Sequence, residues 1–222
     1  MISNEEKKHR IAIPKYTLGE ELISSISHGV GALLGIAALV LCIVRSCNPL
    51  NGFKLASSIV FGLTIILLYL MSCLYHALKV NRAKRVFRVF DHCTIFLLIA
   101  GTYTPFTLVT LRESVGWWMF GIIWGAAVLG IVFNAISLKK FAKISVALYL
   151  IMGWMVIFSF KPLYESLARP GIWMLLGGGI AYTVGAILYG IGSKKKYFHS
   201  VFHFFCLLGT ILHFFAVYLY VL

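Results

Sequence analysis

Two histidines near the end of the chain have the residue type and spacing of metal ligands. His199 and His203 lie four residues apart within the apolar stretch KYFHSVFHFF. On a helix this spacing places both imidazoles on one face, one turn apart, as in the helical HExxH sites that bind one metal ion. The pattern has low specificity by itself, because HxxxH also occurs by chance. Further groups must therefore be identified before a metal site is inferred.

Other polar residues in apolar surroundings could complete such a site. His76 follows Ser72 by four residues, and Asp91 is the only aspartate in the chain. Three neutral imidazoles suit Zn²⁺, and three protein ligands plus a water make up a catalytic zinc site. Zinc would lower the pKa of that water to about 7, and Asp91 could accept its hydrogen bond or act as general base.

Alternative interpretations exist for several of these residues. Asp91 could be a helix N-cap or an ion-pair partner of Arg88, three residues earlier. Cys206, one turn after His203, is a possible softer ligand, although buried cysteines usually behave as small hydrophobic residues. His213 lies ten residues, or about 15 Å along a helix, from His203. That is too far for the same metal, and a hydrogen-bonding role is expected for His213.

The composition indicates that helices within a membrane must position these residues. Of the 222 residues 60% are hydrophobic and 12% are charged, against about 25% charged in soluble proteins. The long unbroken apolar runs do not fit a β-barrel, which shows alternating segments of about ten residues. The polar start of the chain does not resemble a cleaved signal peptide. We expect a cytosolic tail over residues 1–21 and one membrane domain over 22–222.

Seven apolar segments approach the length of about 20 residues that a membrane crossing requires. Such segments must be helical, because lipid offers no partners for backbone polar groups. The expected fold class is therefore an all-α membrane protein with a seven-helix bundle. The segments are roughly 22–44, 53–78, 88–111, 116–138, 142–160, 170–192 and 198–221.

The basic residues predict the orientation of this bundle. The N-terminal tail and the loops after the second, fourth and sixth segments hold 15 of the 20 Lys and Arg residues. By the positive-inside rule the N-terminus is cytosolic and the C-terminus lies outside. The net charge of +13 is explained by this topology, so no nucleic-acid partner is expected. The expected location is the plasma (inner) membrane.

This topology brings ionisable residues from four helices to the same cytosolic depth. They are His28, His76, Asp91 and the pair His199 and His203. Charged groups at membrane depth are costly and mark functional sites by default. Steps of small residues, which let helices approach closely, recur at Gly31 and Gly35, at Gly121 and Gly125, and at Gly177, Ala181 and Gly185. Pro105 is expected to kink the third helix.

Several motifs in order also resemble the hemolysin III family. They are EELISSISHGVGALLG, LLYLMSCLYHAL, VFRVFDHCTIFLLIAGTYTPF, MGWMVIFSFKPL and HSVFHFFCLLGTILHFFAVYLYVL. This family is the bacterial branch of the progestin and adipoQ receptor superfamily. The resemblance covers nearly the whole chain after residue 20. It implies a seven-helix bundle that starts inside and ends outside.

The resemblance also implies roles for particular residues. The superfamily's zinc ligands match His76, in an S-x-x-x-H motif with Ser72, and His199 and His203. An aspartate that contacts zinc through water matches Asp91. The first-helix motif resembles E-x-x-N-x-x-T-H, matched here by Glu21, Ser24, Ser27 and His28. Ser24 replaces the usual Asn and Ser27 the usual Thr, which affects any role that needs the amide but not the zinc ligands.

Three functions are compatible with these observations. The superfamily resembles the alkaline ceramidases, which implies a zinc-dependent hydrolase for a lipid amide or ester, with catalytic roles for Asp91 and Ser72. Alternatively, a structural zinc would stabilise a receptor-like regulator of the membrane. A cytolysin, as the family name suggests, is disfavoured because seven strongly apolar helices stay where they are inserted. Membrane lipids are the expected partners, and the sequence does not predict an oligomeric state.

Overall fold

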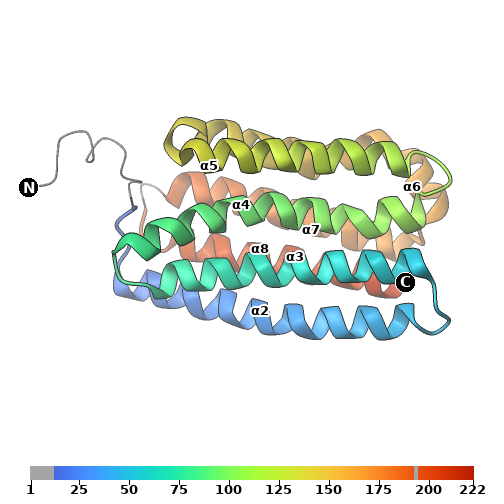
Figure 1. Cartoon of the computed structure of the whole chain (residues 1–222), viewed down its shortest axis with the longest axis horizontal. Coiled ribbons are helices and arrows are strands. Elements are labelled where there is room, and N and C mark those ends of the chain that lie inside the picture. The colour runs from blue at the N-terminus through green and yellow to red at the C-terminus, as the bar shows by residue number, and fades with distance from the viewer. Residues whose placement is uncertain (1–12, 193–194) are drawn as a thin grey trace, which may run out of the picture.

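The computed structural model describes residues 13–192 and 195–222, and in these ranges the chain forms a bundle of helices without β-strands (Figure 1). Most of the expected tail lies outside the described residues, including Lys7, Lys8 and Arg10. Lys194, which the charge count also uses, lies outside them as well. The elements are α2 (Leu18–Ser46), α3 (Gly52–Ala77), α4 (Arg82–Pro105), the π-helix η1 (Phe106–Thr110), α5 (Gly116–Trp154), the 3₁₀-helix η2 (Met155–Ser159), α6 (Phe160–Ser166), α7 (Arg169–Gly192) and α8 (Phe198–Tyr220).

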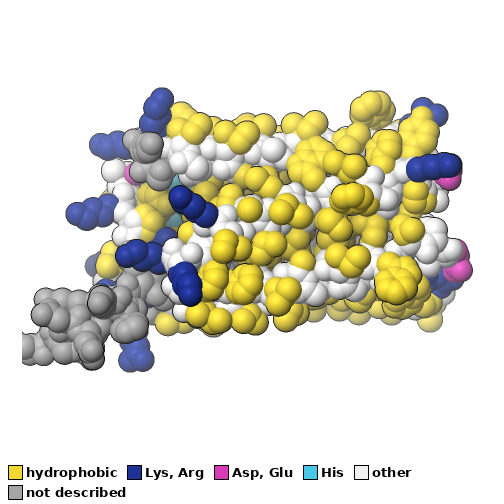
Figure 2. Space-filling model, turned by 90° about the horizontal axis from the view of Figure 1, so that it is seen from above, with side chains coloured by type: hydrophobic (Ala, Val, Ile, Leu, Met, Phe, Trp, Pro, Cys, Tyr) yellow, Lys and Arg dark blue, Asp and Glu magenta, His cyan; other side chains and the backbone are white. Residues whose placement is uncertain are grey.

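Six helical stretches within the described residues are long and apolar enough to cross a membrane. Lys and Arg side chains gather at the two ends of the bundle, with hydrophobic side chains over the face between them (Figure 2). Large apolar side chains such as Phe158 and Trp118 are 82% and 79% exposed. A soluble protein rarely exposes so much apolar surface, so the chain is a multi-pass membrane protein.

The longest stretch, Gly116–Ser166, contains a chain reversal. It has 51 residues, and a straight helix of that length would measure about 77 Å. Ser137 has extended backbone angles, φ −165° and ψ 105°. The Ser145 hydroxyl donates to Asn134 Oδ1 at 2.6 Å, and the rings of Phe133 and Phe141 stack at 4.8 Å. These contacts require the chain to turn back at Ser137, between the expected segments 116–138 and 142–160.

Two helices begin earlier than hydropathy suggests, because polar caps start them. Thr17 and Glu20 form a capping box at the start of α2, so this helix begins at Leu18, inside the expected tail. Asn81 caps α4 by accepting from Lys84 N, so α4 begins at Arg82 and not near residue 88. The N-cap interpretation of Asp91 is therefore wrong, since Asp91 lies well inside α4.

Pro105 changes the type of helix. It is the last residue of α4, and the π-helix η1 follows directly. Proline lacks the N–H that would continue the helical ladder. The Thr107 hydroxyl donates to the Tyr103 carbonyl oxygen at 3.0 Å and so supplies a hydrogen bond beside the break. The expected disturbance at Pro105 is thus a switch to π-helical turns.

Only some of the small-residue steps serve close packing. A Cβ atom at Gly31 would come within 2.6 Å of the Tyr69 ring, and one at Gly35 within 2.8 Å of Ile65. These two glycines therefore let α2 and α3 approach closely. The same expectation for Gly121 is wrong, because a Cβ there would meet nothing within 4 Å in the described part of the chain; Gly125 behaves likewise.

A matched pair of substitutions in α5 tests this difference. A Cβ at Gly130 would overlap the ring of Phe96, which is fully buried. We expect Gly130→Ala to lower the free energy of unfolding by about 1–3 kcal/mol, as overpacking does. Gly125→Ala should be neutral, or stabilising by up to about 1 kcal/mol through helix propensity. Thermal unfolding in detergent measures both, and equal melting temperatures would contradict the packing argument.

Candidate metal centre

Three histidines from two helices direct their ring nitrogens to one point. His76 lies in the last turn of α3, and His199 and His203 lie in the first turns of α8. The Nε2 atoms of His199 and His76 are 3.3 Å apart, and those of His203 and His199 are 3.1 Å apart. The ligand atoms of all three residues lie within 4.8 Å of one another, so the group could hold a metal ion.

The three imidazoles are removed from solvent. His76 is 3% exposed, His199 7% and His203 1%. Buried polar groups normally have hydrogen-bond partners, yet His203 Nδ1 has none in the described part of the chain. Among the described residues these three form the group whose ligand atoms could share a metal. Buried Cys206 is not in it, so the sulfur alternative receives no support.

A carboxylate fixes the orientation of His76. His76 Nδ1 lies 2.7 Å from Glu21 Oε2, and a carboxylate can only accept, so this nitrogen carries the proton. In the neutral tautomer, the Nε2 lone pair then faces Nε2 of His199, 3.3 Å away. Histidine ligands of metals commonly donate their other ring N–H to a carboxylate in this way. Glu21, which enters the sequence analysis only through the first-helix motif, is thus in direct contact with a candidate ligand.

Lys84 also belongs to this centre, which sequence reasoning missed. The charge count treats Lys84 as a loop cation, but the residue is 1% exposed. Its Nζ donates to Glu21 Oε1 at 2.6 Å and to the Leu78 carbonyl oxygen at 2.9 Å. Asn81, which caps α4 three residues earlier, is the one sequence signal that places Lys84 on a helix rather than in a loop.

The starts of α2 and α8 are joined by a second set of hydrogen bonds. Glu20 accepts from the hydroxyl of Thr17 at 2.8 Å and from the backbone N–H of Tyr197 at 2.7 Å. The Ser200 hydroxyl donates to the Glu20 carbonyl oxygen and lies 3.2 Å from the Ser24 hydroxyl. These bonds place the first helix beside the two histidines of the last one. The sequence signal for the start of α2 is the capping-box pattern TLGE, in which Thr17 and Glu20 cap the helix.

Tyr16 covers the histidines from the N-terminal side. Its ring stacks on His199 at 4.6 Å with an interplanar angle of 13°, and it lies 5.8 Å from the His76 ring. Burial raises the pKa of the Tyr16 phenol well above its usual range. The neighbouring phenols of Tyr75 and Tyr189 and the charge of Asp91 add to this increase, whereas the positive charge of Arg88 opposes it.

The other residues expected at the site occupy distinct positions around it. His28 of α2 is 3% exposed, and its ring centre is 3.9 Å from that of His203. Neither ring nitrogen of His28 has a partner in the described part of the chain. Ser72 is buried one turn before His76. Asp91 is half-buried in α4 and is not part of the three-histidine group.

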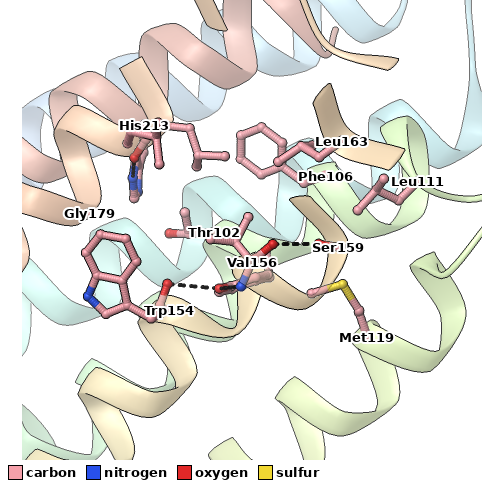
Figure 3. A pocket seen from close by; sticks show the side chains of 14 residues that line it. Thr102, Phe106, Leu111, Met119, Trp154, Val156, Ser159, Leu163, Gly179 and His213 are labelled. Carbon is pink, nitrogen blue, oxygen red and sulfur yellow. Dashed lines mark hydrogen bonds between the residues drawn. The ribbon is translucent and has the colours of Figure 1, made fainter. Parts of the chain in front are cut away.

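His213 serves a separate part of the bundle. Its Nε2 donates to the Leu175 carbonyl oxygen at 2.9 Å, which confirms the expected hydrogen-bonding role. It lines a pocket with Thr102, Phe106 and Trp154, and the three clustered histidines do not line that pocket (Figure 3). The candidate metal centre and this apolar pocket are therefore different sites along the bundle.

Known proteins resemble this chain over nearly its whole length. A family model described as "Haemolysin-III related" matches residues 16–214, a range that includes every site residue named above. The chain is 42% identical over 203 residues to Hemolysin-3 of Bacillus cereus, covering 91% of this chain and 92% of that protein. It is 41% identical over 205 residues to the Hemolysin-3 homolog of Bacillus subtilis (strain 168), covering 92% and 96% respectively. These matches confirm the resemblance seen in the motifs.

Proposed function

The chain belongs to the haemolysin-III-related family, and we propose that it is a zinc-dependent hydrolase of the plasma membrane that acts on a lipid amide or ester. One observation carries the proposal: three buried imidazoles converge through Nε2 at 3.1 and 3.3 Å. The relatives are named as hemolysins, but we do not propose that this chain lyses cells.

The geometry of the histidines supports zinc as the metal. Zinc binds imidazole nitrogen at about 2.0–2.1 Å in tetrahedral sites, which separates two ligand nitrogens by about 3.3 Å. The two Nε2 separations of 3.1 and 3.3 Å agree with this value. Zinc-bound imidazoles commonly donate their other ring N–H to a carboxylate, as His76 does to Glu21. Three protein ligands leave a fourth position for water, as in catalytic sites.

The proposed topology places this centre near the cytosolic leaflet. If Gly116–Ser166 crosses twice, with its reversal at Ser137, the chain crosses the membrane seven times. The excess of Lys and Arg then puts the N-terminus in the cytosol. The starts of α2 and α8 and the end of α3, which carry the centre, lie at that side of the bundle.

Each residue has a defined role in the proposed reaction. His76, His199 and His203 hold the metal through Nε2. A zinc ion bound there would act as a Lewis acid: it would polarise a carbonyl group and lower the pKa of a bound water to about 7. Asp91 acts as general base: it takes a proton from the attacking water onto a carboxylate oxygen and returns it to the amine or alcohol that leaves. Ser72 donates a hydrogen bond to the carbonyl oxygen of the substrate as negative charge develops there.

One observation favours a second function, a membrane regulator with a structural metal. The three histidines are at most 7% exposed, and Tyr16 stacks directly on His199. A centre that stays closed in this way would join α3 and α8 without admitting substrate. The two functions differ in the fourth metal position, which is open in catalytic zinc sites and closed by protein in structural ones.

A hydrolysis assay with metal removal tests the proposed function. Purified protein in detergent is incubated with fluorogenic lipid amides and lipid esters, before and after treatment with a zinc chelator. We expect turnover of one of the two classes, loss of turnover on chelation, and recovery when zinc is added back. If zinc-loaded protein hydrolyses neither class, the hydrolase proposal fails and the regulator with a structural metal takes its place.

A further inference from the structure

Lys84 is a buried cation whose position calls for an explanation. Lysine is almost never fully buried unless it is paired, and here the residue is 1% exposed. Other basic residues of the same connection, such as Lys79 and Arg82, are exposed. A lysine that contributed only to the excess of positive charge on the cytosolic side could remain exposed to water. Its burial indicates a specific role inside the bundle.

The contacts of Lys84 lead directly to the metal centre. Its Nζ lies 2.6 Å from Glu21 Oε1, while the other carboxylate oxygen, Oε2, lies 2.7 Å from His76 Nδ1. The Nε2 of the same imidazole faces His199 at 3.3 Å. The ammonium also lies 5.1 Å from the centre of the Tyr75 ring, within the range of a cation–π contact. A continuous chain of contacts therefore runs from Lys84 through Glu21 to a candidate ligand.

We propose that Lys84 is a positioning residue of the metal centre and acts through Glu21. This inference rests on the proposed metal binding and adds the residue that aligns one ligand. With Oε1 held by Lys84, rotation of the carboxylate would break this ion pair, so Oε2 stays directed at His76. The proton of His76 is then fixed on Nδ1, and the Nε2 lone pair is directed towards the point where a metal would bind.

The same contacts keep Glu21 itself from becoming a ligand. Both carboxylate oxygens are engaged, one by the ammonium of Lys84 and one by His76. A carboxylate released from the ammonium could turn towards a divalent cation, because Asp and Glu oxygens are also zinc ligands. Lys84 thus favours a centre with three imidazoles and an open fourth position.

A purely structural role is the competing explanation. Lys84 Nζ also donates to the carbonyl oxygen of Leu78 at 2.9 Å, and Leu78 is the C-cap of α3. This bond ties the end of α3 to the start of α4, so removing Lys84 could lower stability without any effect through Glu21. The experiment must therefore separate metal affinity from the stability of the metal-free protein.

Zinc affinity in a double-mutant cycle makes this separation. Zinc binding by purified protein is measured in competition with a chromophoric chelator for wild type, Lys84→Met, Glu21→Gln and the double variant. We expect each single variant to bind zinc about 10–100-fold more weakly, as is typical when a group that orients a metal ligand is removed. In the Glu21→Gln background, Lys84→Met should weaken zinc binding by no more than about 2-fold, because coupled residues are not additive. Lys79→Met is the matched control and should keep wild-type affinity.

The double variant also tests whether a loss of zinc affinity in Lys84→Met comes only from misfolding. Lys84→Met alone leaves the Glu21 carboxylate without its ion pair, whereas Lys84→Met with Glu21→Gln leaves no unpaired charge. Melting temperatures of the chelator-treated proteins report the structural role separately. Lys84→Arg, which keeps a cation at this position, should bind zinc more tightly than Lys84→Met.

The possible results distinguish this inference from the proposed function. Wild-type zinc affinity in Lys84→Met would overturn the inference alone, as would two fully additive losses in the cycle. A lower melting temperature of the metal-free protein with unchanged zinc affinity would assign Lys84 to structure only. Zinc binding by the wild type with the expected coupling, but without hydrolysis, would support the inference while the hydrolase proposal fails. A wild-type protein that binds no zinc would overturn both.

Discussion

Purified His199→Ala and His203→Ala proteins are each expected to lack the zinc that we propose the wild-type protein binds. Each substitution removes one of three converging Nε2 donors, and two imidazoles cannot hold the ion in a tetrahedral site with the same strength. The loss of affinity should exceed the value of about 10–100-fold that is typical when only a hydrogen-bond partner of a ligand is removed. Elemental analysis after chelator-free purification measures zinc per chain, with one zinc expected for the wild type.

His213→Ala is the matched control for this prediction. It removes an imidazole from the same helix, but this imidazole bonds the Leu175 carbonyl oxygen and is not part of the cluster. The control should keep its zinc while losing some stability. Equal zinc content in all four proteins would show that the histidines of the cluster are not ligands. An absence of zinc from the wild type would show instead that they form a packing cluster.

Asp91→Asn is expected to abolish the proposed hydrolysis without loss of the proposed zinc. Asn preserves the shape of the side chain but cannot accept a proton, so the general-base contribution of about 10²–10⁴-fold in rate should be lost. Asp91 lies outside the three-histidine group, which is why zinc content should be unchanged. The measurement is the rate of lipid amide or ester hydrolysis per zinc-loaded protein, beside elemental analysis of the same sample.

Glu113→Gln provides a control for the loss of one negative charge. The Glu113 side chain is 84% exposed and pairs with the neighbouring Arg112, so its neutral variant should hydrolyse substrate at the wild-type rate. An Asp91→Asn protein that keeps both zinc and the full rate would remove Asp91 from the reaction. A variant that loses its zinc would make Asp91 part of the metal's coordination instead.

Much of the fold can be predicted from composition, since lipid restricts a membrane chain to very few structures. The apolar segments are helical as expected, because buried backbone groups must bond within the segment. The boundaries are less predictable. Hydropathy places the first and third helices from residues 22 and 88, whereas the caps at Thr17 and Asn81 start them earlier. Side-chain hydrogen bonds decide those ends, and a hydropathy profile does not record them.

The sequence by itself determined the candidate ligands. The HxxxH spacing places His199 and His203 on one face of any helix, and the resemblance to the hemolysin III family adds His76 on another. Helical geometry fixes the first relation, so no knowledge of packing is needed for it. The sequence did not distinguish Gly31, which packs against Tyr69, from Gly121, which faces open space. Both lie in similar small-residue steps, and only the neighbouring helix differs.

Only the tertiary structure decided what surrounds the candidate ligands. Glu21 and Lys84 are 63 residues apart in the sequence, and Lys84 reads as one of several loop cations. It becomes buried because the cap at Asn81 starts α4 early and because α2 lies against the end of α3, with Glu21 facing inward. A buried ammonium is stable only where it is paired with an opposite charge and hydrogen-bonded. That partner is fixed by the packing of helices, which residue spacing within one helix cannot reveal.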